Sequence, residues 1–293
     1  MNGILIINKE SGWTSNDVVQ KVKHIVKEKV GHTGTLDPMA TGVLPLLIGK
    51  GTELSKYLIN HDKEYEVTLK LGIKTSTADS EGEVLEQKNV KKENLFEKNV
   101  KRVLDSFIGK NIQTPPIYSA IKVKGKKLYE YARSGKSVDI PARDIEIYDL
   151  KLLNIDIENK LLTYEIYCSK GTYVRTMCEK IAEALDTVGY MKELQRTMVG
   201  NFKIEDSVTI EELKENFDKK DFLNQKIISL ESFFSKKDKV ILGNKQLSLL
   251  LNGVLIGANY SDDIFRIYNE NGIFIGIAVA TNGKLKRKII VEQ

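Results

Sequence analysis

The sequence predicts an α+β protein in which a mixed, largely antiparallel sheet is flanked by helices and followed by a small β-rich unit. Apolar and polar residues alternate over 65–71, 145–157 and 161–168, which predicts half-buried strands. Apolar residues recur every three or four positions over 18–26, 95–107 and 174–185, which predicts amphipathic helices packed on the sheet. Beyond residue 236 short strands and turns dominate, so we expect a separate small domain there.

Composition places the chain among ordinary globular proteins. The 293 residues are 41% hydrophobic and 29% charged, with a net charge of +5. No apolar run is long enough to cross a bilayer, and no signal-peptide pattern opens the chain. We therefore expect a cytoplasmic protein without membrane contact. The three histidines, and two cysteines ten residues apart, predict neither a metal site nor a disulfide, so Cys168 and Cys178 are expected in the core.

The N-terminal elements follow from apolar runs and one helix start. Residues 4–7 form a short apolar run that predicts a strand, and residues 43–48 predict a buried strand. Thr14 or Ser15 can begin a helix that continues to about residue 29, with His24 on its surface. A further short helix is expected over 54–59.

The stretch over 31–49, GHTGTLDPMATGVLPLLIG, contains one acid, Asp37, among four glycines and two prolines. The glycines permit tight turns, and Pro38 restricts Asp37 to extended geometry. One interpretation is a tight turn in which the aspartate bonds its own backbone. The other is a functional carboxylate held on a stiff loop beside an apolar strand. Local sequence leaves both open.

The middle of the chain contains a polar turn and a basic segment. Residues 76–82, STADSEG, predict a turn that leads into a strand over 83–87, and they lack the spacing of a calcium loop. Between 122 and 136 six basic residues and interleaved tyrosines accompany one acid, Glu130. Such a segment is either a solvated face or a contact for nucleic acid, since cations neutralise phosphates and tyrosines stack on bases.

The segment SKGTYVRT, residues 169–176, joins a strand to a helix. Gly171 provides the turn, Thr172 can cap the helix, and Arg175 lies in its first turn. A cation there opposes the helix macrodipole, so Arg175 is predicted to have a specific anionic partner. Thr209 begins another helix, the stretch up to residue 226 is expected to be a connection, and strands are predicted over 240–242, 265–268, 273–280 and 289–291 around a helix over 244–251.

Several reaction classes are excluded by their missing motifs. No phosphate-binding P-loop, dinucleotide fingerprint or nucleophile triad is present. An isolated carboxylate suits chemistry at a sugar C1′ carbon. Because glycoside hydrolysis usually needs a second acid, a lone aspartate favours a reaction in which no water adds.

Four ordered motifs carry a family resemblance. GHTGTLDPMATGVLPLLIG, KEYEVTLKLG, SAIKVKGKKLYEYAR and CSKGTYVRT resemble the motifs of the TruB-type tRNA pseudouridine-55 synthases, over residues 1 to about 203. The resemblance implies the pseudouridine-synthase fold and isomerisation of one uridine in the T-loop of tRNA after the base is flipped out. It implies no cofactor, no metal and no obligate protein partner. The tail resembles a short PUA domain, so we expect a catalytic domain over 1–235 and a PUA-like RNA-binding domain over 236–293.

The resemblance also assigns roles to individual residues. It implies that Asp37 is the catalytic acid, that Arg175 keeps it ionised, and that Tyr65 stacks on the uracil and relays a proton. It implies that substrate is bound by four further residues: His32, Tyr173, Leu194 and Lys9. Residues 115–143 match an RNA-gripping insertion, whose candidate contacts are Lys122, Lys124, Lys126, Lys127 and Arg133. The chain departs from the family pattern at Glu10, Gly51, Glu53 and Gln195.

Two other functions remain as alternatives. A tRNA-binding folding helper, with catalysis secondary, would use the same RNA contacts. A guide-RNA-dependent relative is less favoured, because a guided enzyme can leave RNA gripping to its partners while this chain has its own basic insertion.

Overall fold

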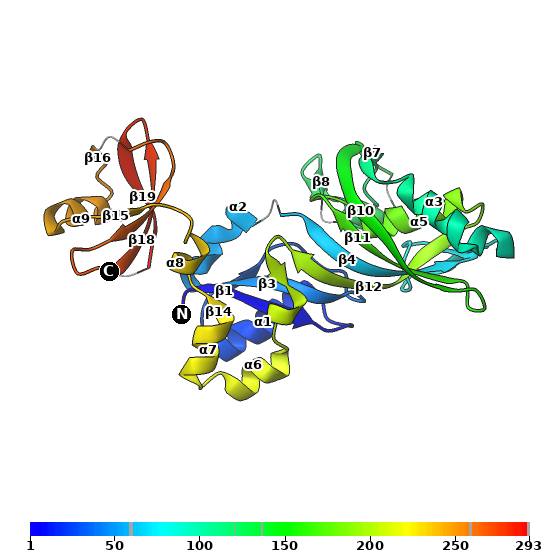
Figure 1. The fold of residues 1–293 in the computed structure, drawn as a ribbon, viewed down its shortest axis with the longest axis horizontal. Coiled ribbons are helices and arrows are strands. Elements are labelled where there is room, and N and C mark those ends of the chain that lie inside the picture. The colour runs from blue at the N-terminus through cyan, green and yellow to red at the C-terminus, as the bar shows by residue number, and fades with distance from the viewer. Residues whose placement is uncertain (59–60, 120, 136, 258–259, 292–293) are drawn as a thin grey trace.

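The large sheet is the centre of the computed structural model, which describes residues 1–58, 61–119, 121–135, 137–257 and 260–291 (Figure 1). Its strand order is β14-β1-β3-β12-β4-β11-β10-β7, with β2 beside β3 and β13 beside β12. Among these described strands only β12 and β3 pair in parallel, which confirms the predicted mixed, largely antiparallel sheet. The strands are β1 (Gly3–Lys9), β2 (Val30–His32), β3 (Thr41–Ile48), β4 (Lys63–Leu71), β7 (Gly109–Gln113), β10 (Arg143–Asp156), β11 (Leu161–Cys168), β12 (Gly189–Val199), β13 (Phe202–Lys203) and β14 (Ile227–Ile228).

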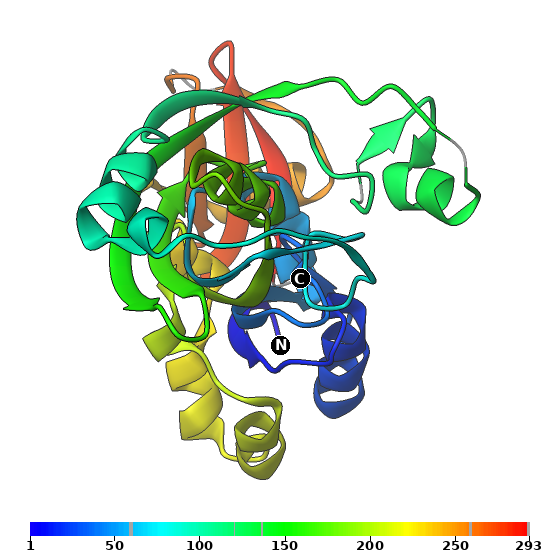
Figure 2. The ribbon, with the colours of Figure 1, turned by 90° about the vertical axis from the view of Figure 1, so that its right-hand side faces the viewer.

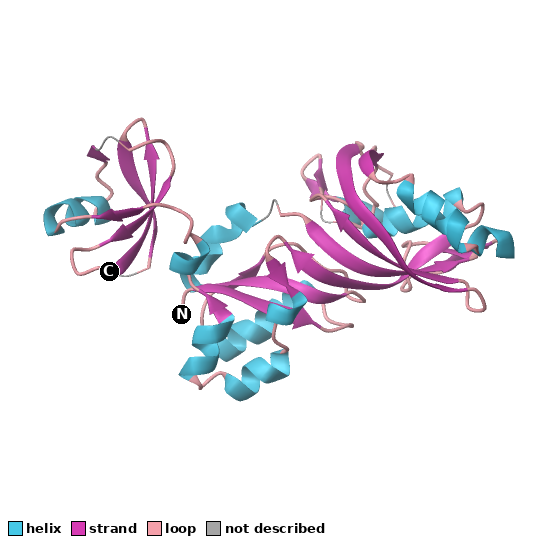
Figure 3. Ribbon diagram, viewed as in Figure 1, coloured by secondary structure: helices cyan, strands magenta, loops and turns pink. Residues whose placement is uncertain are grey.

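Helices pack beside this strand layer (Figure 3). Apolar side chains of α1, α3, α5 and α6 join those of the sheet in one core. The start of α1 follows from its sequence, because the Thr14 side chain accepts from the backbone N–H of Asp17 at 3.1 Å and the Asp17 carboxylate accepts in return. The helices are α1 (Ser15–Val26), α2 (Ser55–Leu58), α3 (Glu97–Asp105), α4 (Leu128–Arg133), α5 (Val174–Ala184), α6 (Ile210–Asn216), α7 (Lys220–Lys226), α8 (Leu230–Phe233) and α9 (Asn244–Leu251).

Three local predictions need correction. The prediction of a connection before residue 226 is wrong, because α7 forms there and is followed by β14, which pairs with β1. Thr172 does not cap α5: its hydroxyl donates to the carbonyl of Ser169 at 2.9 Å, and Tyr173 is the N-cap residue. The predicted helix over 54–59 is split into a 3₁₀ turn, Gly49–Leu54, and α2, while residue 59 lies outside the described part.

The strand β12 was not predicted, although it links β3 to β4 at the middle of the sheet. Its buried side chains do not follow a strict alternation, because bulges interrupt the pairing with β4 between Met191 and Glu193 and between Arg196 and Met198. Each bulge shifts the inward face by one residue. One of its fully buried positions is also an arginine, Arg196, which a search for apolar periodicity passes over.

A smaller five-stranded sheet follows α8, as predicted for the C-terminal part. Its order is β15-β17-β18-β19-β16, and α9 has the predicted bounds. Ile277 and Ile289 of this sheet share an apolar cluster with Ile4 and Leu47 of the large sheet. None of the described helices has the length and apolar composition needed to span a bilayer. The strands are β15 (Lys239–Ile241), β16 (Ile256–Gly257), β17 (Ile264–Tyr268), β18 (Phe274–Thr281) and β19 (Lys284–Ile290).

Two small hairpins extend from the large sheet. One pairs β5 (Ile73–Thr75) with β6 (Val84–Gln87) and contains the predicted polar turn. The other pairs β8 (Lys122–Val123) with β9 (Lys126–Lys127), continues into α4, and projects from the body of the protein (Figure 2). This second hairpin is the centre of the predicted basic insertion.

Candidate active site

The structure brings Asp37 and Arg175 together although they lie 138 positions apart in the sequence. The Nε atom of Arg175 lies 3.1 Å from Oδ2 of Asp37, and Nη2 donates to Oδ1 at 3.4 Å. The Arg175 side chain is 7% exposed, whereas that of Asp37 is 35% exposed. A two-point contact of this kind fixes the orientation of a carboxylate as well as its charge. The Asp37 carboxylate is therefore held by a buried arginine and remains partly exposed to solvent.

Hydrogen bonds from Lys9, at the end of β1, connect the Asp37 loop to the segment between β1 and α1. The buried ammonium of Lys9 donates to the carbonyls of Glu10, Trp13 and Pro38 at 2.9, 2.6 and 3.0 Å. An ammonium has three N–H donors, so these carbonyls occupy all of them. The geometry therefore favours a role for Lys9 in positioning the loop over the direct substrate contact that the resemblance implies.

The other side of the loop is fastened by Arg196 of β12, which is only 1% exposed. Its guanidinium donates to the carbonyls of Val43 and Gly34 at 2.7 and 3.0 Å. Gly42 makes this approach possible: its φ of +100° favours glycine, and a Cβ there would collide with the backbone of Arg196. Gly42 thus allows the close packing of Arg196 against the segment that contains Asp37.

A second carboxylate, that of Asp79, also contacts the guanidinium of Arg175. It lies in the predicted polar turn, is buried, and approaches Nη1 of Arg175 at 3.6 Å through Oδ2. The same guanidinium donates to the carbonyls of Thr77 at 3.3 Å and Tyr118 at 2.9 Å. Sequence reasoning missed Asp79 because a polar turn is an ordinary place for an aspartate. The unfavourable position of Arg175 at a helix start did signal an anionic partner, and the structure supplies two.

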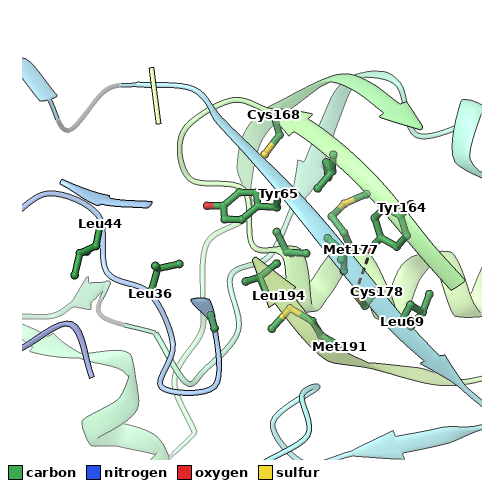
Figure 4. Close-up of a cluster of buried hydrophobic side chains, with 14 of the residues drawn as sticks. Leu36, Leu44, Tyr65, Leu69, Tyr164, Cys168, Met177, Cys178, Met191 and Leu194 are labelled. Atoms are coloured by element: carbon green, nitrogen blue, oxygen red, sulfur yellow. Dashed lines mark hydrogen bonds between the residues drawn. The ribbon is translucent and has the colours of Figure 1, made fainter. Parts of the chain in front are cut away.

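A cavity of about 480 Å³ opens beside the ion pair. Its walls include Asp37, Tyr65, Tyr118, Tyr173, Leu194 and Arg196. Figure 4 shows the Tyr65 ring beside Leu194 and Cys168, with its hydroxyl directed toward the side on which Leu36 and Leu44 lie. Burial raises the pKa of Tyr65 to about 12, so its hydroxyl keeps its proton at neutral pH. Aromatic and aliphatic walls beside a few charged groups suit a planar, partly polar ligand.

His32 lies on β2 and is not among the residues that line this cavity. Its Nδ1 atom is buried and has no hydrogen-bond partner among the described residues. Burial, reinforced by the nearby Arg196, lowers the pKa of His32, so the imidazole is neutral at physiological pH.

Neither a metal nor a reactive thiol is indicated in the described part of the chain. No group of three His, Cys, Asp or Glu side chains there has an arrangement that could hold a metal ion. Cys168 and Cys178 are both buried and unpaired, which confirms their predicted place in the core. Burial raises the pKa of each thiol to about 12, so neither is a ready nucleophile.

The pKa of Asp37 predicts the pH dependence of any reaction that needs the ionised carboxylate. Burial and the nearby Asp79 raise this pKa above its ordinary value of 3.8, while Arg175 opposes the shift. As the pH is lowered, the reaction rate should therefore begin to fall with a midpoint above pH 3.8, because the carboxylate becomes protonated. Replacing Asp79 with asparagine removes one of the raising charges, so the acid limb of the pH–rate profile should move to lower pH. A profile that moves to higher pH would contradict this account.

The fold is shared with a chain of a solved multiprotein complex. The chain matches a chain in the crystal structure of a Cbf5–Nop10–Gar1 complex with a TM-score of 0.67 and 24% identity, covering 99% of this chain and 84% of that one. At this identity the match establishes the architecture alone. It also confirms the fold class predicted from sequence.

Sequence comparison assigns the family. Residues 22–174 match the model of the TruB family pseudouridylate synthase N-terminal domain, and residues 175–235 match that of the tRNA pseudouridylate synthase B C-terminal domain. Proteins named tRNA pseudouridine synthase B from Clostridium novyi and Francisella philomiragia are 41% and 40% identical, covering 98% and 100% of this chain and 98% and 96% of theirs. These matches, with the fold and the site, define a pseudouridine synthase, an isomerase. Within that class, the chain belongs to the TruB family.

Proposed function

We propose that this enzyme converts the uridine at position 55, in the T-loop of tRNA, into pseudouridine, with Asp37 as the catalytic carboxylate. The observation that carries the proposal is the Asp37 side chain, held at two points by Arg175 and open to a cavity of about 480 Å³ with tyrosine side chains in its wall. The relatives are named as tRNA pseudouridine synthases, which supports tRNA as the substrate. The four sequence motifs support the T-loop position.

The proposed reaction is an isomerisation in which atoms balance within the nucleoside. Asp37 acts at the ribose while the N1–C1′ bond breaks, and the uracil turns inside the cavity. C5 then bonds to C1′, the proton on C5 leaves, and N1 gains a proton. Tyr65 is placed to stack on the base and, because its hydroxyl is protonated, to pass a proton. Asp79 is bound to Arg175 and accepts from Thr77 at 2.5 Å, so it is not free to activate water.

The basic hairpin supplies the proposed grip on RNA. Lys122, Lys124 and Lys126 are exposed on it, and Lys127 is half-buried. Arg133 belongs to α4, but its side chain lies outside the described part. The C-terminal sheet adds exposed Lys284, Lys286 and Lys288 on β19, in keeping with a PUA-like RNA-binding domain over 236–293 beside a catalytic domain over 1–235.

The activity itself is tested by mapping pseudouridine in an unmodified tRNA transcript after incubation with the protein. Product at position 55 and at no other uridine is expected. Folded protein and intact RNA without product there would reject the proposed function, and product at another position would reject the assignment of the site.

The hairpin predicts a salt-dependent effect on binding. Replacing Lys122, Lys124 and Lys126 together with alanine should weaken tRNA binding. The slope of log K against log salt concentration should become less steep by up to about 2 to 3, since each phosphate contact contributes roughly 0.7–0.9 to that slope. The single-turnover rate at saturating enzyme should stay near the wild-type value. The matched control replaces Lys21, Lys23 and Lys27, three exposed lysines of α1 and its C-cap, and changes the net charge equally. Equal losses of affinity in both triple variants would show that only net charge matters.

A further inference from the structure

A buried amide at the end of β7 contacts the first residue of the α5 segment. Gln113 is 1% exposed, so its polar atoms need partners inside the protein. Its Nε2 donates to the carbonyl of Tyr173 at 3.1 Å, and its Oε1 accepts from the N–H of Tyr173 at 2.8 Å. One side chain therefore pairs with both backbone groups of a residue 60 positions away.

This contact gives a partner to the first of the N–H groups at the start of α5. The first N–H groups of a helix have no partner within the helix. Tyr173 is the N-cap residue, and its own side chain makes no capping hydrogen bond. Thr172, the predicted cap, donates to Ser169 instead. The acceptor that the structure gives to the Tyr173 N–H is Oε1 of Gln113.

The position of the Tyr173 backbone also affects the ion pair between Arg175 and Asp37, because Arg175 follows Tyr173 by two residues. Tyr173 lines the cavity, and Arg175 orients Asp37. The segment that leaves β7 makes a second contact here, since the carbonyl of Tyr118 accepts from Nη2 of Arg175 at 2.9 Å. The chain leading from the sheet into the basic hairpin thus touches the start of α5 at Tyr173 and at Arg175.

We propose that Gln113 is a positioning residue for the isomerisation: by pairing with the backbone of Tyr173 it sets the wall of the base cavity and the direction from which Arg175 meets Asp37. This inference rests on the proposed function and deepens it. A carboxamide is required because one donor and one acceptor must face the N–H and C=O of the same residue. Glutamate keeps the size and the acceptor, but its second oxygen faces the carbonyl of Tyr173 without a proton to donate.

The test compares Gln113→Glu with wild type on the tRNA transcript. We expect the single-turnover rate to fall at least about tenfold, as a loss of orientation in the transition state does. The Kd for tRNA should change by less than about threefold. The acid limb of the pH–rate profile should move to higher pH, because a displaced Arg175 lowers the pKa of Asp37 less. The matched control is Gln87→Glu on the exposed strand β6, which should behave as wild type.

If the glutamate variant does not fold, the role of Gln113 is tested by a second variant and by hydrogen exchange in the wild-type protein. Gln113→Met keeps the volume without polar atoms and should show the same fall in rate at unchanged Kd. In the wild-type protein, amide hydrogen exchange at Tyr173 should be strongly protected by the bond to Gln113. Wild-type rates in a folded Gln113 variant, a loss of rate explained by Kd alone, or an unprotected Tyr173 amide would each overturn the inference. A wild-type enzyme without product would instead reject the proposed function, and the exchange measurement would still test the contact.

Discussion

Replacing Asp37 with asparagine is expected to abolish pseudouridine formation while tRNA binding stays within about twofold of wild type. Asparagine keeps the size of the side chain but has no negative charge and no proton affinity near neutral pH. General acid–base roles alone contribute about 10²- to 10⁴-fold, so the single-turnover rate should fall at least this much. In the proposed function, tRNA binding depends on the basic hairpin and the C-terminal lysines, which the substitution does not alter. Rates are measured by product mapping at saturating enzyme.

The Asp37→Asn variant is also expected to be at least as stable as wild type at neutral pH. The pKa of Asp37 is raised in the folded protein, so its protonated form is favoured there, and the stabilisation that this gives is lost as the pH rises through the folded pKa. At neutral pH the wild type has lost that contribution, whereas a neutral asparagine does not ionise. The melting temperature of Asp37→Asn at neutral pH should therefore equal or exceed that of wild type. A clear fall in melting temperature would show that the ion pair with Arg175 outweighs the burial of the charge.

Asp37→Asn also separates the enzyme from the folding-helper alternative. A helper acts through binding, so the variant would rescue tRNA maturation in a strain that lacks the protein. An isomerase whose product matters to the cell would not be replaced by it. Asp37→Glu, with the charge kept but displaced, provides the matched chemical control, because full activity there would show that the position of the carboxylate is not critical.

Sequence reasoning succeeded where a local rule decides the structure. The start of α1 is set by a reciprocal cap between Thr14 and Asp17, and α9 has the bounds that its pattern predicts. It also assigned Arg175 an anionic partner from the helix macrodipole alone. These signals are readable because each depends on residues within one turn of helix.

It failed where distant segments decide the structure. The two bulges in β12 and the buried Arg196 remove the alternation that identifies a strand, and they are tolerated because β4 and the Asp37 loop surround them. Asp79 has no local mark of importance, since its role depends on Arg175, 96 positions further along the chain. The pairing of Gln113 with Tyr173 is hidden for the same reason.

Arg175→Lys is expected to reduce the single-turnover rate about 10²- to 10³-fold with little change in tRNA binding, which is the scale seen when one oriented donor of a catalytic site is lost. The charge is kept, but a lysine has no planar fork to meet Asp37 at two points while also reaching Asp79 and the carbonyl of Tyr118. The acid limb of the pH–rate profile should move to higher pH. The matched control is Arg102→Lys on the exposed surface of α3, which should leave the rate and the profile unchanged.

Arg175→Met isolates the electrostatic part of the same role. It leaves Asp37 and the buried Asp79 without their shared cation, and breaking a buried pair in this way costs about 3–5 kcal/mol. Loss of the guanidinium raises the pKa of Asp37 further, so the folded state prefers the protonated acid more strongly. Stability relative to wild type should therefore be lowest near neutral pH and should recover as the pH falls toward the raised pKa, measured by chemical denaturation at several pH values. A loss of stability that does not depend on pH would mean that packing around the arginine stem, and not charge, is what Arg175 provides to the fold.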